Sequence, residues 1–196
     1  MRGMKAVLAA AVLTAVGGVA RADLYNFNGT DVDVEYWTGN GANDAMMVVD
    51  FGPQSYAFGY HFDTPASGAQ MLGAVAANGG LDYSYSDFGS FGIAVNTLTY
   101  GAATMGGGGW PTDWVAYWSS SDGQAWTPSA VGASDRLLSN GAWDGWAKTT
   151  TDVWPPNESP YAPVPEPGTL TLAATGAATL LGLARLRRVT GAARRG

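Results

Sequence analysis

An uncharged apolar run near the C-terminus limits what this chain can fold into more than any other feature. Residues 168–184 consist only of Leu, Ala, Thr and Gly. At a rise of about 1.5 Å per residue, a helix over this run is about 25 Å long, enough for a short membrane span. Because the run is apolar on every face, it does not suit a helix of a soluble core. The sequence therefore predicts a transmembrane helix over 168–184.

Arginines close the apolar run on its C-terminal side. Arg185, Arg187 and Arg188 follow it directly, and residues 185–196 contain no acidic residue. Basic residues beside a membrane span are retained on the cytoplasmic side. We therefore expect residues 185–196 to form a basic cytoplasmic tail, with these three arginines as the membrane stop.

A proline-rich tripeptide precedes the run: Pro165, Glu166 and Pro167. The tripeptide, the short apolar helix and the arginine cluster together resemble the PEP-CTERM sorting signal of exported bacterial proteins. The resemblance implies that the tail holds the exported protein in the inner membrane until a membrane enzyme, an exosortase, recognises the tripeptide and cuts. The body then moves to the cell surface or the extracellular matrix. The alternative is an ordinary C-terminal anchor that stays uncleaved.

The N-terminus carries a second export feature. Residues 1–22 have a basic start, an apolar centre over 6–20 and small residues at Ala20 and Ala22. This order is typical of a secretory signal peptide that is cleaved after Ala22. Both ends of the chain therefore predict an exported protein.

Removing the two ends leaves a strongly acidic body. Fifteen of the sixteen acids lie between residues 23 and 158, whereas Arg136 and Lys148 are the only bases there, which gives a formal charge of −13. Nucleic acid and anionic lipid would be repelled by such a surface. Cations, neutral glycans and basic proteins stay open as partners.

The composition of the body favours a mainly β fold. The chain has no Cys and 28 Gly, and all eight Trp lie in the body, so turns are frequent and aromatic burial replaces disulfides. We expect one extracytoplasmic α+β domain over 23–154, with antiparallel sheet and one helix. A proline-rich linker over 155–167 is expected to act as an extended spacer.

Local patterns place the elements of this domain. In residues 31–37, alternation puts Val32, Val34 and Tyr36 on one face and three acids on the other. Asn40-Gly41 indicates a hairpin from this strand to residues 45–51, and residues 55–62 read as a central strand. Ser67 is the expected cap of the one helix, which Asn78-Gly79-Gly80 ends. The other predicted strands are 81–85, 93–100, 113–119 paired with 124–127, and 141–148.

The body also resembles, in its order of elements and in the stretches YWSSSDG and LLSNGAWDGW, a small domain of unknown function related to the β-domain of cobalamin carriers. This resemblance implies a similar β-rich body. It carries no ligand over to this chain, and no cofactor is expected.

Catalytic and metal-binding patterns are weak. His61 is the only His, which excludes a triad or a two-His metal site within one chain. Asp31, Asp33 and Glu35 could bind Ca²⁺ if loop oxygens joined them, but a solvated acidic face is the simpler interpretation. We therefore expect no metal site and no enzymatic activity, and a secreted hydrolase is the distant alternative.

Tryptophans suggest a binding alternative. Trp114, Trp118, Trp126 and Trp143 are candidates for stacking on the flat faces of sugars, with exopolysaccharide as the ligand. Core packing is the competing explanation for the same side chains. The sequence thus predicts a non-catalytic surface or matrix protein processed by an exosortase, with a glycan-binding module as the alternative.

Overall fold

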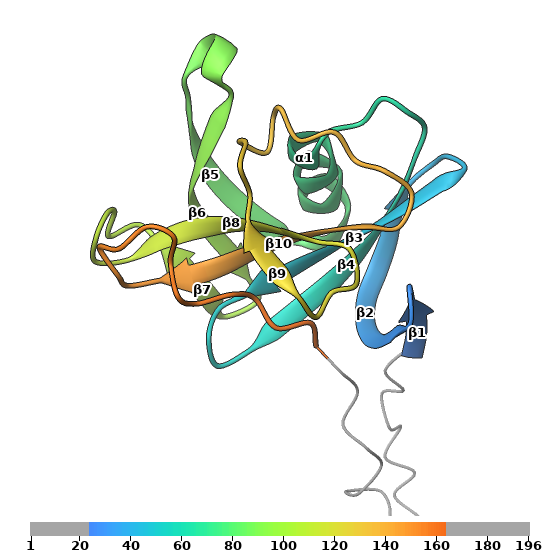
Figure 1. Ribbon diagram of the computed structural model, residues 1–196, viewed down its shortest axis with the longest axis horizontal. Coiled ribbons are helices and arrows are strands. Elements are labelled where there is room, and N and C mark those ends of the chain that lie inside the picture. Colours follow the sequence, from blue (N-terminus) through green and yellow to red (C-terminus); the bar gives the residue numbers. More distant parts are fainter. Residues whose placement is uncertain (1–23, 164–196) are drawn as a thin grey trace, which may run out of the picture.

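The computed structural model describes residues 24–163 (Figure 1). The predicted signal peptide, the Pro165–Pro167 tripeptide, the apolar run and the basic tail lie outside these residues. Within the described part, no helix is long and apolar enough to cross a membrane. The elements are β1 (Leu24–Phe27), β2 (Thr30–Gly39), β3 (Asn43–Asp50), β4 (Ser55–Phe62), α1 (Gly68–Gly79), β5 (Leu81–Asp87), η1 (Gly89–Phe91), β6 (Ile93–Tyr100), β7 (Ala103–Gly106), β8 (Trp114–Ser120), β9 (Trp126–Pro128) and β10 (Ala142–Thr149).

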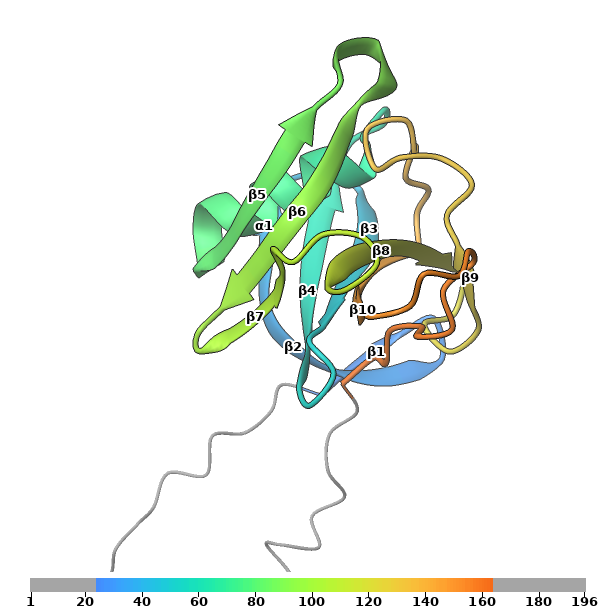
Figure 2. The same ribbon diagram turned by 90° about the vertical axis from the view of Figure 1, so that its left-hand side faces the viewer.

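The fold is mainly β, as predicted, and is built on one curled seven-stranded sheet. The strand order in this sheet is β1-β2-β4-β3-β10-β8-β9, and β5, β6 and β7 form a smaller antiparallel sheet. Figure 2 shows the small sheet and α1 together on one side of the large one. The large sheet is mixed, because β2 pairs with β4 and β10 pairs with β3 in parallel. The prediction of purely antiparallel sheet is therefore wrong.

The predicted hairpin between residues 31–37 and 45–51 is also wrong. β4 lies between β2 and β3, so the connection through Asn40-Gly41 crosses the end of β4 instead of turning back beside β2. A Cβ atom at Gly39 would lie 2.3 Å from the His61 carbonyl oxygen, and one at Gly41 would lie 2.0 Å from the Phe62 backbone. The glycines are needed because the two backbones touch where they cross.

The single predicted α-helix is confirmed. The Ser67 hydroxyl accepts a hydrogen bond from the Gln70 amide at 3.3 Å, and the Gln70 side chain accepts one from the Ser67 amide at 2.8 Å. This capping box starts α1, and Gly80 ends it in the left-handed conformation. The helix buries its predicted apolar stripe, Met71, Leu72 and Val75, against the large sheet.

Most of the remaining strands lie close to where they are predicted. β5 and β6 pair, β8 and β9 form the expected hairpin, and β10 is the last strand. Strands β1 and β7, which have four residues each, are not predicted from the sequence. The prediction that Val32, Val34 and Tyr36 of β2 share one face is also wrong. A register shift between Val34 and Tyr36 turns Tyr36 to the opposite face from Val32 and Val34.

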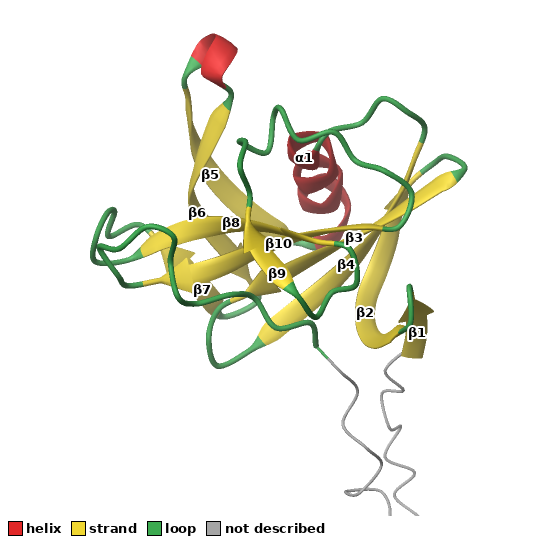
Figure 3. Ribbon diagram, viewed as in Figure 1, coloured by secondary structure: helices red, strands yellow, loops and turns green. Residues whose placement is uncertain are grey.

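The large sheet is buried on both faces. We call the face under α1 the inner face and the opposite face the outer face. Figure 3 shows the helix on one side and the last described residues, 155–163, on the other. On β3, Met47 and Val49 pack on the inner face while Met46 and Val48 pack on the outer face, and all four side chains are fully buried. The outer cluster consists of Phe27, Val32, Val34, Met46, Val48, Ala57 and Trp143.

A buried ion pair fixes the loop that closes the inner face. Asp144 on β10 is 1% exposed, and its carboxylate accepts a 2.7 Å hydrogen bond from Arg136 Nε and another from the Tyr117 hydroxyl. Burial, followed by the Asp144 charge, raises the pKa of Tyr117. The Arg136 carbonyl accepts a hydrogen bond from the Gly68 amide at 3.0 Å, so the ion pair also holds the start of α1 in place.

We expect Arg136→Met to lower the free energy of unfolding by about 3–5 kcal/mol, because Asp144 would stay buried without its cation. Lys148→Met is the matched control. Lys148 contacts Asp113 at 3.7 Å in a partly exposed pair, so its loss should cost at most about 1 kcal/mol. Urea unfolding of the two variants measures both values, and equal destabilisation would contradict a structural role specific to the Asp144 pair.

Candidate functional site

The last described residues pack on the sheet. Residues 155–163, here called the C-terminal segment, fall in the stretch that the sequence assigns to an extended linker, but Pro156 and Pro160 within it are buried. The Asp33 amide donates to the Pro163 carbonyl at 2.8 Å, which ties the end of the segment to β2. The segment is therefore attached to the body up to the second residue before Pro165.

Two further contacts fasten the C-terminal segment to neighbouring strands. The Tyr161 amide donates to Asp50 Oδ2 at 2.9 Å, and the Ser55 hydroxyl donates to the Tyr161 carbonyl. Asp50 is 5% exposed, and burial raises its pKa, whereas the amides of Gly52 and Tyr161 act to lower it. The segment thus supplies one of the backbone donors that a buried carboxylate needs.

A glycine on β10 makes room for the segment. A Cβ atom at Gly145 would lie 2.5 Å from Pro160 Cγ and 2.7 Å from the Trp126 ring. The proline ring therefore sits where a side chain of β10 would otherwise stand. Proline suits this position because it has no backbone N–H group that would need an acceptor.

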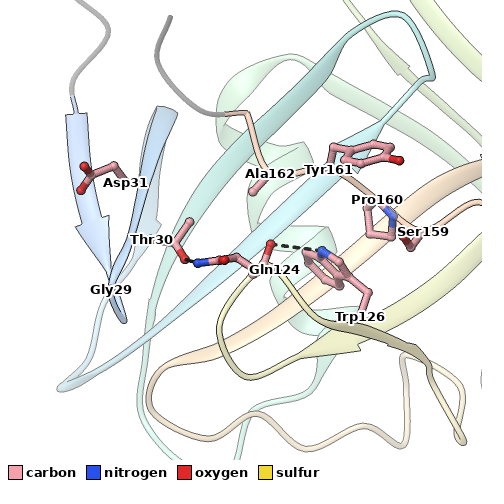
Figure 4. Close-up of a pocket in the computed structure, with 10 residues that line it drawn as sticks. Gly29, Thr30, Asp31, Gln124, Trp126, Ser159, Pro160, Tyr161 and Ala162 are labelled. Carbon is pink, nitrogen blue, oxygen red and sulfur yellow. Dashed lines mark hydrogen bonds between the residues drawn. The ribbon is translucent and has the colours of Figure 1, made fainter. Parts of the chain in front are cut away.

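A cleft of about 650 Å³ opens between the C-terminal segment and two loops of the sheet (Figure 4). Its walls are the turn between β1 and β2, the loop before β9, and the last residues of the C-terminal segment. The residues that line it are Gly29, Thr30, Asp31, Gly123, Gln124, Trp126, Ser159, Pro160, Tyr161 and Ala162.

The loop wall of the cleft is held rigidly. Asp122 Oδ1 accepts hydrogen bonds from the amides of Gln124 and Ala125, both at 2.9 Å, and these bonds lower the pKa of Asp122. Gln124 Nε2 donates to the Thr30 hydroxyl at 2.9 Å, and that hydroxyl donates to the Asp122 carbonyl at 2.6 Å. The loop and the β1–β2 turn therefore form one connected wall.

Aromatic rings and neutral polar groups dominate the cleft. Trp126 is half-buried, and its Nε1 donates to the Gly123 carbonyl at 3.1 Å, which fixes the ring, while Tyr161 is 75% exposed (Figure 4). Gln124, Thr30 and Ser159 add amide and hydroxyl groups, and no Lys or Arg lines the cleft. Flat rings beside uncharged donors and acceptors suit a hydroxylated ligand of low charge.

The four predicted stacking tryptophans divide into two pairs. Trp126 lines the cleft and Trp114 is half-exposed at the start of β8. Trp118 is 4% exposed and Trp143 is 0% exposed, so the prediction of ligand stacking is wrong for these two. Their strands, β8 and β10, lie inside the large sheet, where both faces are covered.

Gln124, Ser159 and Tyr161 were missed by the sequence analysis. The C-terminal segment reads as a spacer because of its prolines, and no local pattern shows that it folds back. The position of Tyr161 between Pro160 and Pro163 was the one available hint in the sequence, since an extended spacer has no need of a large aromatic ring.

The acidic strand does not form a compact cluster. Asp31 accepts from Asn26 Nδ2 at 2.6 Å, whereas Glu35 accepts from the Tyr100 hydroxyl at 3.0 Å; burial and then this carboxylate raise the pKa of Tyr100 to about 12. Within residues 24–163, no group of three or more His, Cys, Asp or Glu side chains could hold a metal ion. His61 contacts Asp44 Oδ1 at 2.6 Å and stacks on Trp37, which suits a structural residue.

Comparison of the chain with models of protein families, with curated proteins and with solved structures finds no match in any of the three. The resemblances to the sorting signal and to the cobalamin-carrier domain therefore stay predictions. The function has to be argued from the cleft, the C-terminal segment and the charges of the chain itself.

Proposed function

We propose that this protein is an exported surface or matrix protein that is sorted and processed through Pro165, Glu166 and Pro167 and has no catalytic role. The observation that carries the proposal is the attachment of the C-terminal segment to the sheet up to Pro163. Pro163, the last described residue, is two residues before the tripeptide in the sequence. A processing enzyme of the exosortase type is the partner that the resemblance of the tail to a sorting signal implies.

The distance between the body and the membrane follows from the same attachment. Five residue steps separate Pro163 from the start of the apolar run at 168, and a fully extended chain of that length spans about 18 Å at most. Before processing, the body therefore rests at the outer surface of the inner membrane. Cleavage then releases it to the cell surface or the matrix.

The charge of the body suits this destination. Of its two basic residues, Arg136 is paired with Asp144 and Lys148 with Asp113. A released body of charge −13 is repelled by anionic lipid and nucleic acid, so it has little tendency to stay on the membrane after cleavage.

A binding role fits the cleft better than the hydrolase alternative does. Asp31 is the only acidic residue among the residues that line it. Most glycoside hydrolases need two carboxyl groups on either side of the bond that they cut. We therefore assign no reaction to the cleft.

Replacing Glu166 by Ala tests the sorting proposal. The variant should insert in the membrane like the parent, because the apolar run and Arg185, Arg187 and Arg188 are unchanged, but it should accumulate uncleaved. Glu158→Ala removes an acid from the same stretch before the tripeptide and should be released normally. Immunoblotting of membrane and extracellular fractions measures the outcome, and release of the Glu166 variant at the parent level would contradict the proposal.

A second candidate function is the binding of a neutral glycan in the cleft, such as an exopolysaccharide. The observation that favours it is the fixed Trp126 ring in the cleft, with the exposed Tyr161 and several amide and hydroxyl groups also in the lining. Sugars offer apolar C–H faces to such rings and hydroxyls to such polar groups. The absence of Lys and Arg from the lining argues for an uncharged sugar.

We expect Tyr161→Ala to weaken binding to a neutral polysaccharide at least about tenfold, which corresponds to about 1.4 kcal/mol. Tyr85→Ala, which removes a 49% exposed ring from β5, should leave the affinity unchanged. Isothermal titration calorimetry with a soluble neutral polysaccharide measures both. Equal affinity of the two variants would remove the cleft as a glycan site without affecting the sorting proposal.

A further inference from the structure

Three tryptophans converge at the opposite end of β8 from the cleft loop. Trp110 precedes β8, Trp114 begins it, and Trp154 follows β10. The ring centroids of Trp110 and Trp114 are 5.0 Å apart, and those of Trp114 and Trp154 are 6.2 Å apart. We call these three rings the tryptophan platform.

The platform is open to solvent. Trp110 is 54% exposed and Trp154 is 60% exposed, and the neighbouring Val153 is 53% exposed. Trp114 is half-buried and is held by a 2.9 Å hydrogen bond from its Nε1 to the Thr151 carbonyl. The fixed Trp114 ring is therefore close to two rings that are more exposed. Core packing does not account for the two outer rings, because most of their surface touches nothing in the domain.

A groove continues the platform along the molecule. It has a volume of about 320 Å³, and Trp114 and Trp154 form part of its wall. Its remaining lining is mostly aliphatic and comes from β6, β8, β10 and the loop that follows β9, including Val95, Val115 and Val131. An extended ligand can therefore pass from the open rings into a recess instead of resting on a flat surface alone.

We propose that the tryptophan platform binds a chain of neutral polysaccharide by stacking successive sugar rings on Trp110, Trp114 and Trp154. The rings are inclined to one another by 50° and 32°, so they do not pack face to face. The negative faces of the indole rings attract the axial C–H groups of a pyranose. Thr112 and Asp152, both exposed and close to the platform in sequence, can bind sugar hydroxyls at its edges.

Charge selects the class of ligand. The nearest base, Lys148, is already paired with Asp113 next to Trp114, and the other base of residues 24–163 is paired with Asp144. An acidic polysaccharide or an anionic lipid surface would meet a body of charge −13 with neither base free to receive it. A neutral sugar chain has no such cost, because it offers apolar faces without charge.

The platform is independent of the cleft. The two share no lining residue, and the cleft uses Trp126 and Tyr161 instead. The platform proposal therefore holds whether or not the cleft binds a glycan, and it does not depend on how the tail is processed. Two separate surfaces would also allow one body to hold two chains.

Affinity electrophoresis of the full chain, purified in a mild non-ionic detergent, tests the proposal. The gels contain hydroxyethyl cellulose, galactomannan or, as the acidic comparison, alginate. We expect the parent to be retarded by at least one neutral polymer and not by alginate. Trp110→Ala and Trp154→Ala should each weaken this retardation at least about tenfold. Both replaced side chains are mostly exposed, so an unchanged urea unfolding midpoint will show that the variants fold.

Two further variants separate the possible outcomes. Phe91→Ala removes an 84% exposed ring from the hairpin between β5 and β6 and should bind like the parent. Trp126→Ala reports on the cleft. Loss of binding in the Trp126 variant together with parent-like binding of the Trp110 and Trp154 variants would overturn the platform and leave the cleft as the site. Absence of retardation of the parent in both neutral polymers, or equal retardation in alginate, would also overturn the proposal.

Discussion

The structure depends on covering both faces of one curled sheet without the help of a disulfide. In β3 the last six residues, 45–50, are all buried, so the strand at the middle of the sheet tolerates no solvent on either side. Helix α1 and the small sheet cover the inner face. The outer face is covered where β1 and β2 curl over it and where the C-terminal segment lies against it. Because no Cys is present, these covers have to be held by packing, by the Asp144 ion pair and by backbone hydrogen bonds.

Local sequence signals were sufficient to predict the elements whose ends are marked by capping or turn residues. The Ser67 cap and the Asn78-Gly79-Gly80 stop predicted the helix, and the polar loop before Trp126 predicted the β8–β9 hairpin. Pairing partners could not be predicted in the same way, since alternation along β2 contains no information on whether β3 or β4 lies beside it. The bulge at Tyr36 shows the same limit, because one extra residue reverses the face of every side chain after it.

The residues of the candidate site could be predicted only in part from the sequence, because burial also depends on how the strands assemble. On strands that are covered on both faces, Trp118 and Trp143 look the same in sequence as Trp114 and Trp126, and only the assembled sheet separates buried rings from exposed ones. The C-terminal segment was misread because prolines favour both an extended spacer and a packed segment without backbone donors. Its place on the sheet connects the two halves of our proposal: the same residues wall the cleft through Tyr161 and lead directly to the sorting tripeptide.

The central claim is that the C-terminal segment belongs to the folded body. Urea unfolding of two soluble forms that end after Pro163 or after Trp154 tests it most directly. The three hydrogen bonds of the segment contribute about 1 kcal/mol each, and the burial of Pro156 and Pro160 adds to this. We predict that the shorter form loses roughly 3–5 kcal/mol of stability. Equal stability of the two forms would show that the segment is a spacer after all and would contradict the account.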